Sequence, residues 1–306
     1  MAGGITMSVL DVHTHFSIET SAISEDSDRV GFVVENKSIE EHLSVMDRLG
    51  ITRAVLSCPT QKYLDDAGKC TVYCRQVNEA GSRIITEYPE RFSFVASMPL
   101  PYVENALNEL SYAVEVLGAC GVGLCSNYAG LYLGNPKLEP LFDGIERAGV
   151  PVILHPAAPP EYPKDPVTGK ILPMFEFITD TTRTLLDMFA SGVLKRHPGL
   201  RIVVPHSGSC LPVAFDRYCG IMRATGQYEP VPIEQLYFDL ACDAYPRGVP
   251  ILLTLTDTSH ILYGTDYPAI PEAVLRQHLD HTMSCKYFDE CLDDVLWKNA
   301  ARLFGI

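Results

Sequence analysis

The stretch that decides the fold is residues 11–15, Asp11-Val12-His13-Thr14-His15, which overlaps the first apolar run of the chain, residues 8–12. In an extended strand, side chains at positions i and i+2 point to the same side, so His13 and His15 are predicted to face the same way. At the carboxyl end of a barrel strand that side is the interior, where two imidazoles can bind one divalent ion. The alternative is a pair of partly exposed loop histidines, and the rest of the chain must decide between them.

Working outward, short apolar runs recur along the chain, and each is followed by a helical pattern. The predicted strands are residues 8–12, 53–58, 92–98, 121–124, 151–155, 201–205, 236–240 and 261–263. The predicted helices are residues 38–49, 71–88, 103–117, 138–148, 174–194 (one helix or two), 211–224, 271–283 and 288–304. Eight alternations in 306 residues fit a single-domain (β/α)8 barrel of the TIM type, spanning residues 1–306. A doubly wound open sheet is the alternative architecture.

Two segments carry further local signals. The helix at residues 38–49 begins with Ser38 as its N-cap, has Glu41 three residues later, and is followed by Gly50 as its stop. Residues 156–173 follow the fifth strand, are rich in proline, and are too long for a simple connection. We therefore predict that this insertion is a functional loop or a lid.

Composition narrows the possible partners. The chain has 24 basic and 38 acidic residues, a formal net charge of −14, which argues against nucleic acid or an anionic membrane as a partner. A small anionic substrate is still possible, because one local cation can outweigh the overall field. No apolar stretch is long enough to span a membrane, and residues 1–7 lack signal-peptide features, so a cytoplasmic location is expected. The 10 cysteines contain no CxxC pair and are interpreted as ordinary thiols.

Polar residues also follow other predicted strands at the point where each strand ends. His155 ends the fifth run, His206 follows the sixth, and Asp266 comes shortly after the eighth. Barrel enzymes place their sites at this end of the strands, where an unpaired buried charge is costly unless it binds a metal or a partner. We therefore predict that these residues join His13 and His15. The other histidines are interpreted as surface or capping residues: His42, His197, His260, His278 and His281.

These motifs together resemble the amidohydrolase superfamily: His13-Thr14-His15, His155-Pro156, His206-Ser207-Gly208 and Gly264-Thr265-Asp266-Tyr267-Pro268. The similarity extends over about residues 8–306 and is greatest to the decarboxylase branch. That branch includes the aminocarboxymuconate semialdehyde, γ-resorcylate and 6-methylsalicylate decarboxylases. The stretch Asp180-Thr181-Thr182-Arg183-Thr184 adds to this resemblance.

The resemblance implies a metal site with His13, His15, His155 and Asp266 as ligands, and with His206 and Asp266 as catalytic residues. It implies one divalent ion per subunit, zinc or alternatively manganese, and no organic cofactor. Binuclear members use a carbamylated lysine at the end of strand 4, but here no lysine lies between Lys69 and Lys137. A mononuclear centre is therefore expected.

The resemblance also suggests substrate-binding residues. In the aminocarboxymuconate semialdehyde decarboxylase, the arginine at the spacing of Arg217 is donated across a dimer interface to the substrate carboxylate. The resemblance therefore implies the same role for Arg217, in a homodimer or a higher homo-oligomer. The alternative for Arg217 is a helix-surface residue paired with Asp216 or Glu229. Arg29 is a candidate for a second substrate arginine. Further candidates for the pocket wall, which are equally compatible with simple packing, are Phe16, Asn127, Tyr128, Pro159 and Tyr162.

Three functions remain open at this point. The first is a metal-dependent, non-oxidative decarboxylase of a small aromatic, salicylate-like acid or a related unsaturated carboxylic acid. The second is a mononuclear metal-dependent hydrolase or hydratase that acts on a lactone or a carboxylated ring-cleavage product. The third is a catalytically inactive barrel that serves as a binding protein, which we disfavour because every motif position is filled. An anion-binding group beside the metal would favour the decarboxylase.

Overall fold

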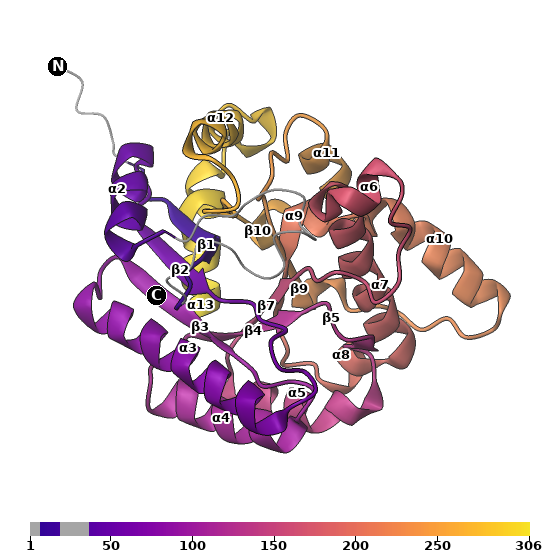
Figure 1. Cartoon of the computed structure of the whole chain (residues 1–306). Helices are drawn as coiled ribbons and strands as arrows, with labels where there is room; N and C mark the ends of the chain where they lie inside the picture. Colours follow the sequence, from indigo (N-terminus) through magenta and orange to yellow (C-terminus); the bar gives the residue numbers. More distant parts are fainter. Residues whose placement is uncertain (1–6, 19–36) are drawn as a thin grey trace.

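Eight parallel strands close into a barrel in this computed structural model, which describes residues 7–18 and 37–306. The strands are β1 (Leu10–His15), β2 (Arg53–Ser57), β3 (Phe92–Ser97), β4 (Gly121–Cys125), β7 (Val152–His155), β8 (Ile202–Val204), β9 (Leu236–Asp239) and β10 (Ile261–Leu262). They follow one another around the barrel in sequence order (Figure 1). The barrel closes between its first and last strands, because the Val12 amide of β1 donates to the Tyr263 carbonyl at 3.0 Å and Thr14 pairs with Tyr267, both just after β10. The predicted (β/α)8 barrel is confirmed.

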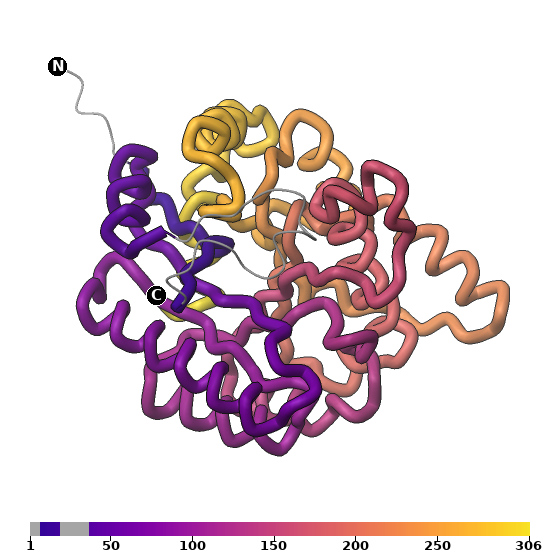
Figure 2. The backbone as a smooth tube through the Cα atoms, in the orientation of Figure 1, coloured from indigo at the N-terminus to yellow at the C-terminus, as the bar shows by residue number. Residues whose placement is uncertain are grey.

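Helices surround the strands, as the ribbon and the backbone tube both show (Figures 1 and 2). The longer ones are α2 (Ile39–Leu49), α3 (Ala67–Glu87), α4 (Val103–Glu115), α5 (Glu139–Ala148), α7 (Glu176–Ser191), α10 (Leu211–Ala224) and α12 (Glu272–Met283). Shorter ones are α6 (Val167–Lys170), α8 (Val193–Arg196), α9 (Pro205–Gly208), α11 (Gly248–Leu252) and α13 (Asn299–Phe304). In the described part of the chain, no helix combines the length and the apolar character that crossing a bilayer requires.

Single turns and a hairpin complete the described elements. The 3₁₀ turns are η1 (Pro136–Leu138), η2 (Leu172–Met174), η3 (Ile233–Gln235), η4 (Thr258–His260) and η5 (Lys286–Phe288), and η6 (Asp294–Lys298) is a π-helical turn. An antiparallel hairpin of β5 (Asn127–Tyr128) and β6 (Leu131–Tyr132) lies outside the barrel sheet. The sequence analysis did not predict this hairpin.

Local sequence accounts for helix α2. The Ser38 hydroxyl accepts the Glu41 amide at 3.2 Å, and the Glu41 carboxylate accepts the Ser38 amide at 2.9 Å, so the predicted cap is present. Gly50 ends the helix with φ of 76°, a left-handed conformation that glycine adopts without steric cost. His42 on this helix is only 3% exposed, which corrects its interpretation as a surface residue.

Some predicted boundaries were wrong. The helix predicted at residues 71–88 begins earlier, because Asp66 caps it by accepting the Lys69 amide at 3.0 Å. The segment 174–194, predicted as one helix or two, starts two residues later and is two helices, α7 and α8, because Gly192 takes a left-handed φ of 76° between them. The helix predicted at residues 288–304 is replaced by the π-helical turn η6 followed by the short helix α13.

The floor of the barrel is apolar. Inward-facing residues of the strands, among them Leu10, Val12 and Val55, form one buried cluster with Ala300 and Phe304. The last two belong to α13, which packs against β1 and β10 and brings the C-terminus beside the first strands (Figure 2). A second, larger cluster lies between the outward faces of the strands and the helices. The polar site is therefore confined to the opposite, carboxyl end of the strands.

A β-bulge in β1 sets the direction of its side chains. Asp11 pairs with Ala54 and Thr14 with Leu56, so three steps along β1 match two steps along β2. The extra residue reverses the alternation of side chains after Val12. Leu10 and Val12, which precede the extra residue, can therefore fill the floor. His13 and His15 would face outward in a regular strand, but the bulge turns them into the interior as well. Thr14 points outward and its hydroxyl meets His42 Nε2 at 3.1 Å.

Candidate metal centre

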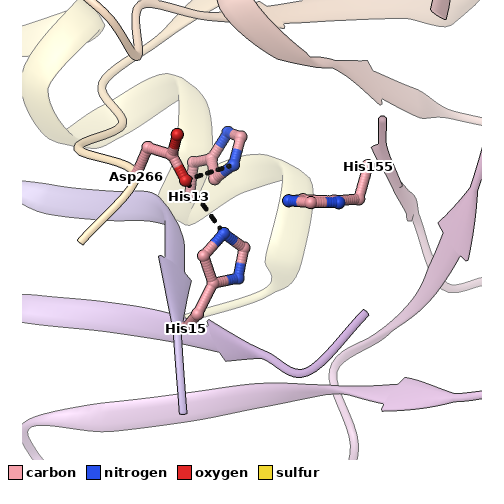
Figure 3. Close-up of side chains that lie close together, drawn as sticks. All are labelled: His13, His15, His155 and Asp266. Atoms are coloured by element: carbon pink, nitrogen blue, oxygen red, sulfur yellow. Dashed lines mark hydrogen bonds and ion pairs between the residues drawn. The ribbon is translucent and has the colours of Figure 1, made fainter. Parts of the chain in front are cut away.

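Four side chains converge at the mouth of the barrel (Figure 3). His13 and His15 come from β1, His155 ends β7, and Asp266 follows β10. One ligand atom of each residue lies within 4.8 Å of the others. Asp266 Oδ1 is 3.1 Å from His15 Nε2 and 3.5 Å from His13 Nε2. The structure thus brings together the four residues predicted from the sequence as ligands.

Each of the three imidazoles is held at its other ring nitrogen. Nδ1 of His13 lies 2.9 Å from the Asp239 carboxylate, and Nδ1 of His155 lies 2.8 Å from the Pro156 carbonyl. Nδ1 of His15 lies 2.8 Å from Ser57 Oγ, whose own proton is donated to the Thr14 carbonyl at 3.2 Å. Oxygen acceptors at all three Nδ1 atoms place the ring proton there and leave a lone pair on each Nε2.

These lone pairs face a carboxylate oxygen, and two electron-rich groups so close together need a cation between them. His13 Nε2 is buried and finds no hydrogen-bond partner among the described residues. Three imidazoles and one carboxylate form a donor set that suits zinc or manganese. The residues present therefore fit a divalent metal ion.

Electrostatics within the cluster supports the same conclusion. Burial lowers the pKa of His155 well below its usual value, and the neighbouring histidines lower it further, so this ring stays neutral. Burial opposes ionisation of Asp266, but the nearby rings of His13 and His15 outweigh it and hold the pKa of this carboxyl well below its usual range. A neutral imidazole and an ionised carboxylate are the forms that bind metal.

Asp239 is a functional residue that the sequence analysis missed. It is fully buried at the end of β9, where Oδ2 meets His13 and Oδ1 accepts the amides of His206 at 3.0 Å and Ala241 at 3.1 Å. One carboxylate thus orients His13, a predicted metal ligand, and the loop that carries His206. The sequence pattern that singled out Asp266, a charged residue at the end of an apolar strand, also applies to Asp239 and could have identified it.

Asp11 joins the first and last strands of the site. Its carboxylate accepts the Thr265 hydroxyl at 2.5 Å and the amides of Thr265 and His13, both at 3.0 Å. Burial raises the pKa of Asp11 to about 7, although these hydrogen bonds oppose the rise. The contacts fix the loop that presents Asp266, whose φ of 61° is left-handed.

His206 lies beside the four residues but is held differently. Its Nε2 is 3.6 Å from Asp266 Oδ2, the carboxylate oxygen that faces away from His15. Its Nδ1 is buried with no hydrogen-bond partner in residues 7–18 and 37–306. His206 has a φ of 56° and stands in a run of left-handed residues that continues to Ser209. Such backbone costs energy and is concentrated at functional sites.

The site opens into a cavity of about 700 Å³, a size suited to a small organic molecule. His15, His155, His206 and Asp266 lie on its wall, and so does Phe16, as predicted. Both ends of the insertion at residues 156–173 line it too, through Pro156, Ala157, Ala158, Leu172 and Pro173. Within the described wall, the cationic residues are Lys37 and Lys62.

Other predicted substrate residues lie elsewhere. Arg217 is exposed on α10 and outside the described wall of the cavity, so its role across an interface stays a prediction. Its suggested partner Glu229 pairs instead with Lys195. Pro159 and Tyr162 are not among the described wall residues, and Arg29 lies outside the described residues.

Asn127 and Tyr128 are structural rather than exposed to the cavity. The Asn127 amide donates to Asp180 at 2.8 Å and to the Ala158 carbonyl at 3.1 Å, while the Tyr128 hydroxyl accepts the Cys125 amide at 3.0 Å. Asp180 is fully buried and also accepts the Ser126 hydroxyl at 2.5 Å. These contacts tie α7 to the loops after β4 and β7. Substrate binding by Asn127 therefore stays a prediction, and its observed contacts stabilise the wall.

His197 is a further correction. It was interpreted as a surface or capping residue, but it is only 3% exposed. Its Nε2 lies 2.6 Å from Glu139 and its Nδ1 lies 3.3 Å from Glu146. These contacts join α8 to α5 and lie away from the metal centre.

The chain belongs to the amidohydrolase family, whose pattern it matches over residues 10–306. It is 28% identical over 292 residues to 6-methylsalicylic acid decarboxylase of Penicillium expansum, and the match covers 88% of each chain.

Solved structures share the fold. The structure of 2,6-dihydroxybenzoate decarboxylase with bound 2,6-dihydroxybenzoate matches with a TM-score of 0.82 at 22% identity, covering 98% of this chain and all of that one. A dihydroxybenzoic acid decarboxylase from a Polaromonas species, with bound manganese and 2-nitroresorcinol, matches with a TM-score of 0.83 at 20% identity, covering 98% of this chain and 97% of the other.

Proposed function

We propose that this protein is a metal-dependent, non-oxidative decarboxylase of a small aromatic acid that carries a hydroxyl group beside its carboxylate. The observation that carries the proposal is the position of the Asp266–His206 pair. Its two side chains lie on the wall of the cavity, directly beside the three imidazoles. The relative from Penicillium expansum, which covers most of both chains, supports an aromatic acid as the substrate.

The described wall suits such a substrate. Phe16 and Phe177 offer apolar surface against which an aromatic ring can pack. Lys37 and Lys62 place positive charge on the same wall, where it attracts a carboxylate. Positive charge of this kind favours an anionic acid over a neutral lactone as the substrate.

We assign the metal to His13, His15, His155 and Asp266, with zinc and manganese as the two candidates. When bound there, a divalent ion supplies Lewis-acid stabilisation of the negative charge that develops on the substrate oxygens. The three Nδ1 partners, Asp239, Ser57 and the Pro156 carbonyl, keep the ligand atoms aimed inward throughout the reaction.

The chain's own residues handle the proton. Loss of CO2 breaks the bond between the ring carbon and the carboxyl carbon, and the electron pair left on the ring must take up a proton. We assign its delivery to Asp266 Oδ2, and its replacement to His206 Nε2, which lies 3.6 Å away.

The test is to load the protein with manganese or zinc, add substituted salicylates, and measure the release of CO2 and of the phenol. Benzoates that lack the adjacent hydroxyl are matched controls and should react much more slowly. Turnover of a salicylate that stops when the metal is chelated supports the proposal. Hydrolysis of a lactone without turnover of any such acid would favour the hydrolase instead.

A further inference from the structure

Asp266 presents its two carboxylate oxygens to two different groups of side chains. Oδ1 faces the imidazoles of β1, whereas Oδ2 lies 3.6 Å from His206 Nε2 and 3.6 Å from Cys242 Sγ. These nitrogen, sulfur and oxygen atoms all lie within 4.8 Å of one another. The second group also lines the cavity, and Cys242 is exposed there. A cation can therefore reach it from solvent.

Two of the three separations among these atoms match a tetrahedral metal. Zinc bonds of about 2.1 Å to oxygen and about 2.3 Å to sulfur, at the tetrahedral angle, place the two ligand atoms about 3.6 Å apart. The separation of Asp266 Oδ2 and Cys242 Sγ is 3.6 Å. The nitrogen and oxygen ligands of such an ion are about 3.4 Å apart, close to the 3.6 Å between His206 and Asp266. These two separations need almost no change to fit an ion, and the third, between His206 Nε2 and Cys242 Sγ, is within 4.8 Å.

The backbone holds Cys242 in this position. Cys242 and Asp243 both have left-handed φ angles, 64° and 58°. On one side, the Ala241 amide is bound by Asp239 at 3.1 Å, and on the other, the Asp243 carboxylate meets His281 of α12 at 2.8 Å. The thiol is thus presented to Asp266 between two anchored residues.

We propose that His206, Cys242 and Asp266 form a second site, for a soft divalent ion such as zinc, and that an ion bound there inhibits the enzyme. The Cys242 thiol releases its proton to solvent as the sulfur–metal bond forms. The ion takes the lone pairs of His206 Nε2 and Asp266 Oδ2, the two atoms assigned to proton transfer. The inhibition, but not the site itself, rests on the proposed function.

The donor sets make the two sites selective. The first centre has no sulfur ligand and accepts manganese, whereas thiolate favours softer ions such as zinc and cadmium. A protein loaded with manganese should therefore bind one further cadmium ion per chain without losing its manganese. Cadmium is the useful probe, because its bond to thiolate gives an ultraviolet charge-transfer band.

The experiment titrates cadmium into manganese-loaded protein and records this band, the metal content by elemental analysis, and the turnover of a salicylate. Cys242→Ser and Cys242→Ala are the test variants, and both residues tolerate the exposed position. Cys125→Ser is the matched control, because Cys125 lines the same cavity but belongs to neither described group of ligands. Each protein is compared with its own rate in manganese alone.

The unsubstituted protein and Cys125→Ser should show the band, one manganese and one cadmium per chain, and loss of turnover. The Cys242 variants should lose the band. The cadmium concentration needed for inhibition should rise by more than about 100-fold, because the loss of a partner that only orients a ligand already costs about 10–100-fold in metal affinity. The absence of a band in unsubstituted protein, or cadmium replacing the manganese, would overturn the site. A band with unchanged turnover would overturn the inhibition. A band without turnover of any acid, even before cadmium is added, would contradict the proposed function and leave the site standing.

Discussion

Replacing Asp239 by asparagine tests whether the metal centre depends on a side chain that is not itself a ligand. In Asp239→Asn, the amides of His206 and Ala241 still need the acceptor that lies 3.0 and 3.1 Å from them. The new amide oxygen must therefore keep the place of Oδ1, and the new NH2 group turns toward His13. Two donors then face each other across the 2.9 Å contact. His13 can relieve this only by moving its proton to Nε2, the atom that should bind the metal.

Loss of a partner that orients a metal ligand costs about 10–100-fold in metal affinity, and we expect the upper end because the contact is fully buried. This corresponds to about 2.7 kcal/mol. The assay is competition between the protein and a chromophoric chelator for manganese, with turnover measured in parallel at saturating metal.

Asp180→Asn is the matched control, since it also removes a fully buried carboxylate but touches none of the predicted ligands. It should lower the thermal midpoint of unfolding and leave manganese affinity unchanged. An Asp239→Asn protein that binds manganese as tightly as the unsubstituted protein would refute the reasoning. Equal weakening by both variants would show that the effect is only a loss of stability.

Three further predictions concern other residues. Burial lowers the pKa of His42 to about 3, so below the unfolded value of about 6.5 the unfolded chain takes up a proton that the folded chain refuses. The protonation of His42 in the unfolded chain should therefore lower the free energy of unfolding by about 2 kcal/mol from pH 7 to pH 5. In His42→Gln, this contribution should be absent when the free energy of unfolding is measured with urea at both pH values. His206→Ala should keep its manganese yet lose most turnover, and loss of the metal instead would make His206 a ligand. Arg217→Ala should raise KM for the acid without a comparable fall in kcat if Arg217 binds the carboxylate, and mixing it with an Asp266→Asn protein should restore activity only if it acts across an interface.

Local signals in the sequence were sufficient for much of the scaffold. The cap of α2 was predictable because Ser38, Glu41 and Gly50 act through contacts within a few residues of one another. The strand order was predictable because a barrel leaves little choice once eight strands alternate with helices. The replacement of the predicted helix at residues 288–304 by η6 and α13 was not, because no glycine or proline marks a break there in the sequence.

The four residues that meet at the barrel mouth were predictable from their places at strand ends, but their supporting contacts were not. Asp239 could not be separated from an ordinary strand-end aspartate, because its role depends on a contact 226 residues away with His13. Asn127 was predicted to bind substrate, and only the structure shows it turned toward Asp180. Cys242 was interpreted as an ordinary thiol, because the residues beside it in the sequence do not predict the left-handed backbone that brings it to Asp266.

The bulge in β1 gives this strand one position at which a codon can be lost without shifting the pairing on either side. Loss of the His13 codon would let Asp11, Val12 and Thr14 pair regularly with Ala54, Val55 and Leu56, and His15 would still face the interior. The apolar floor, built from residues before the bulge, would keep its packing. One deletion would thus give a barrel that lacks a single imidazole at its mouth, a starting point for installing a different metal centre.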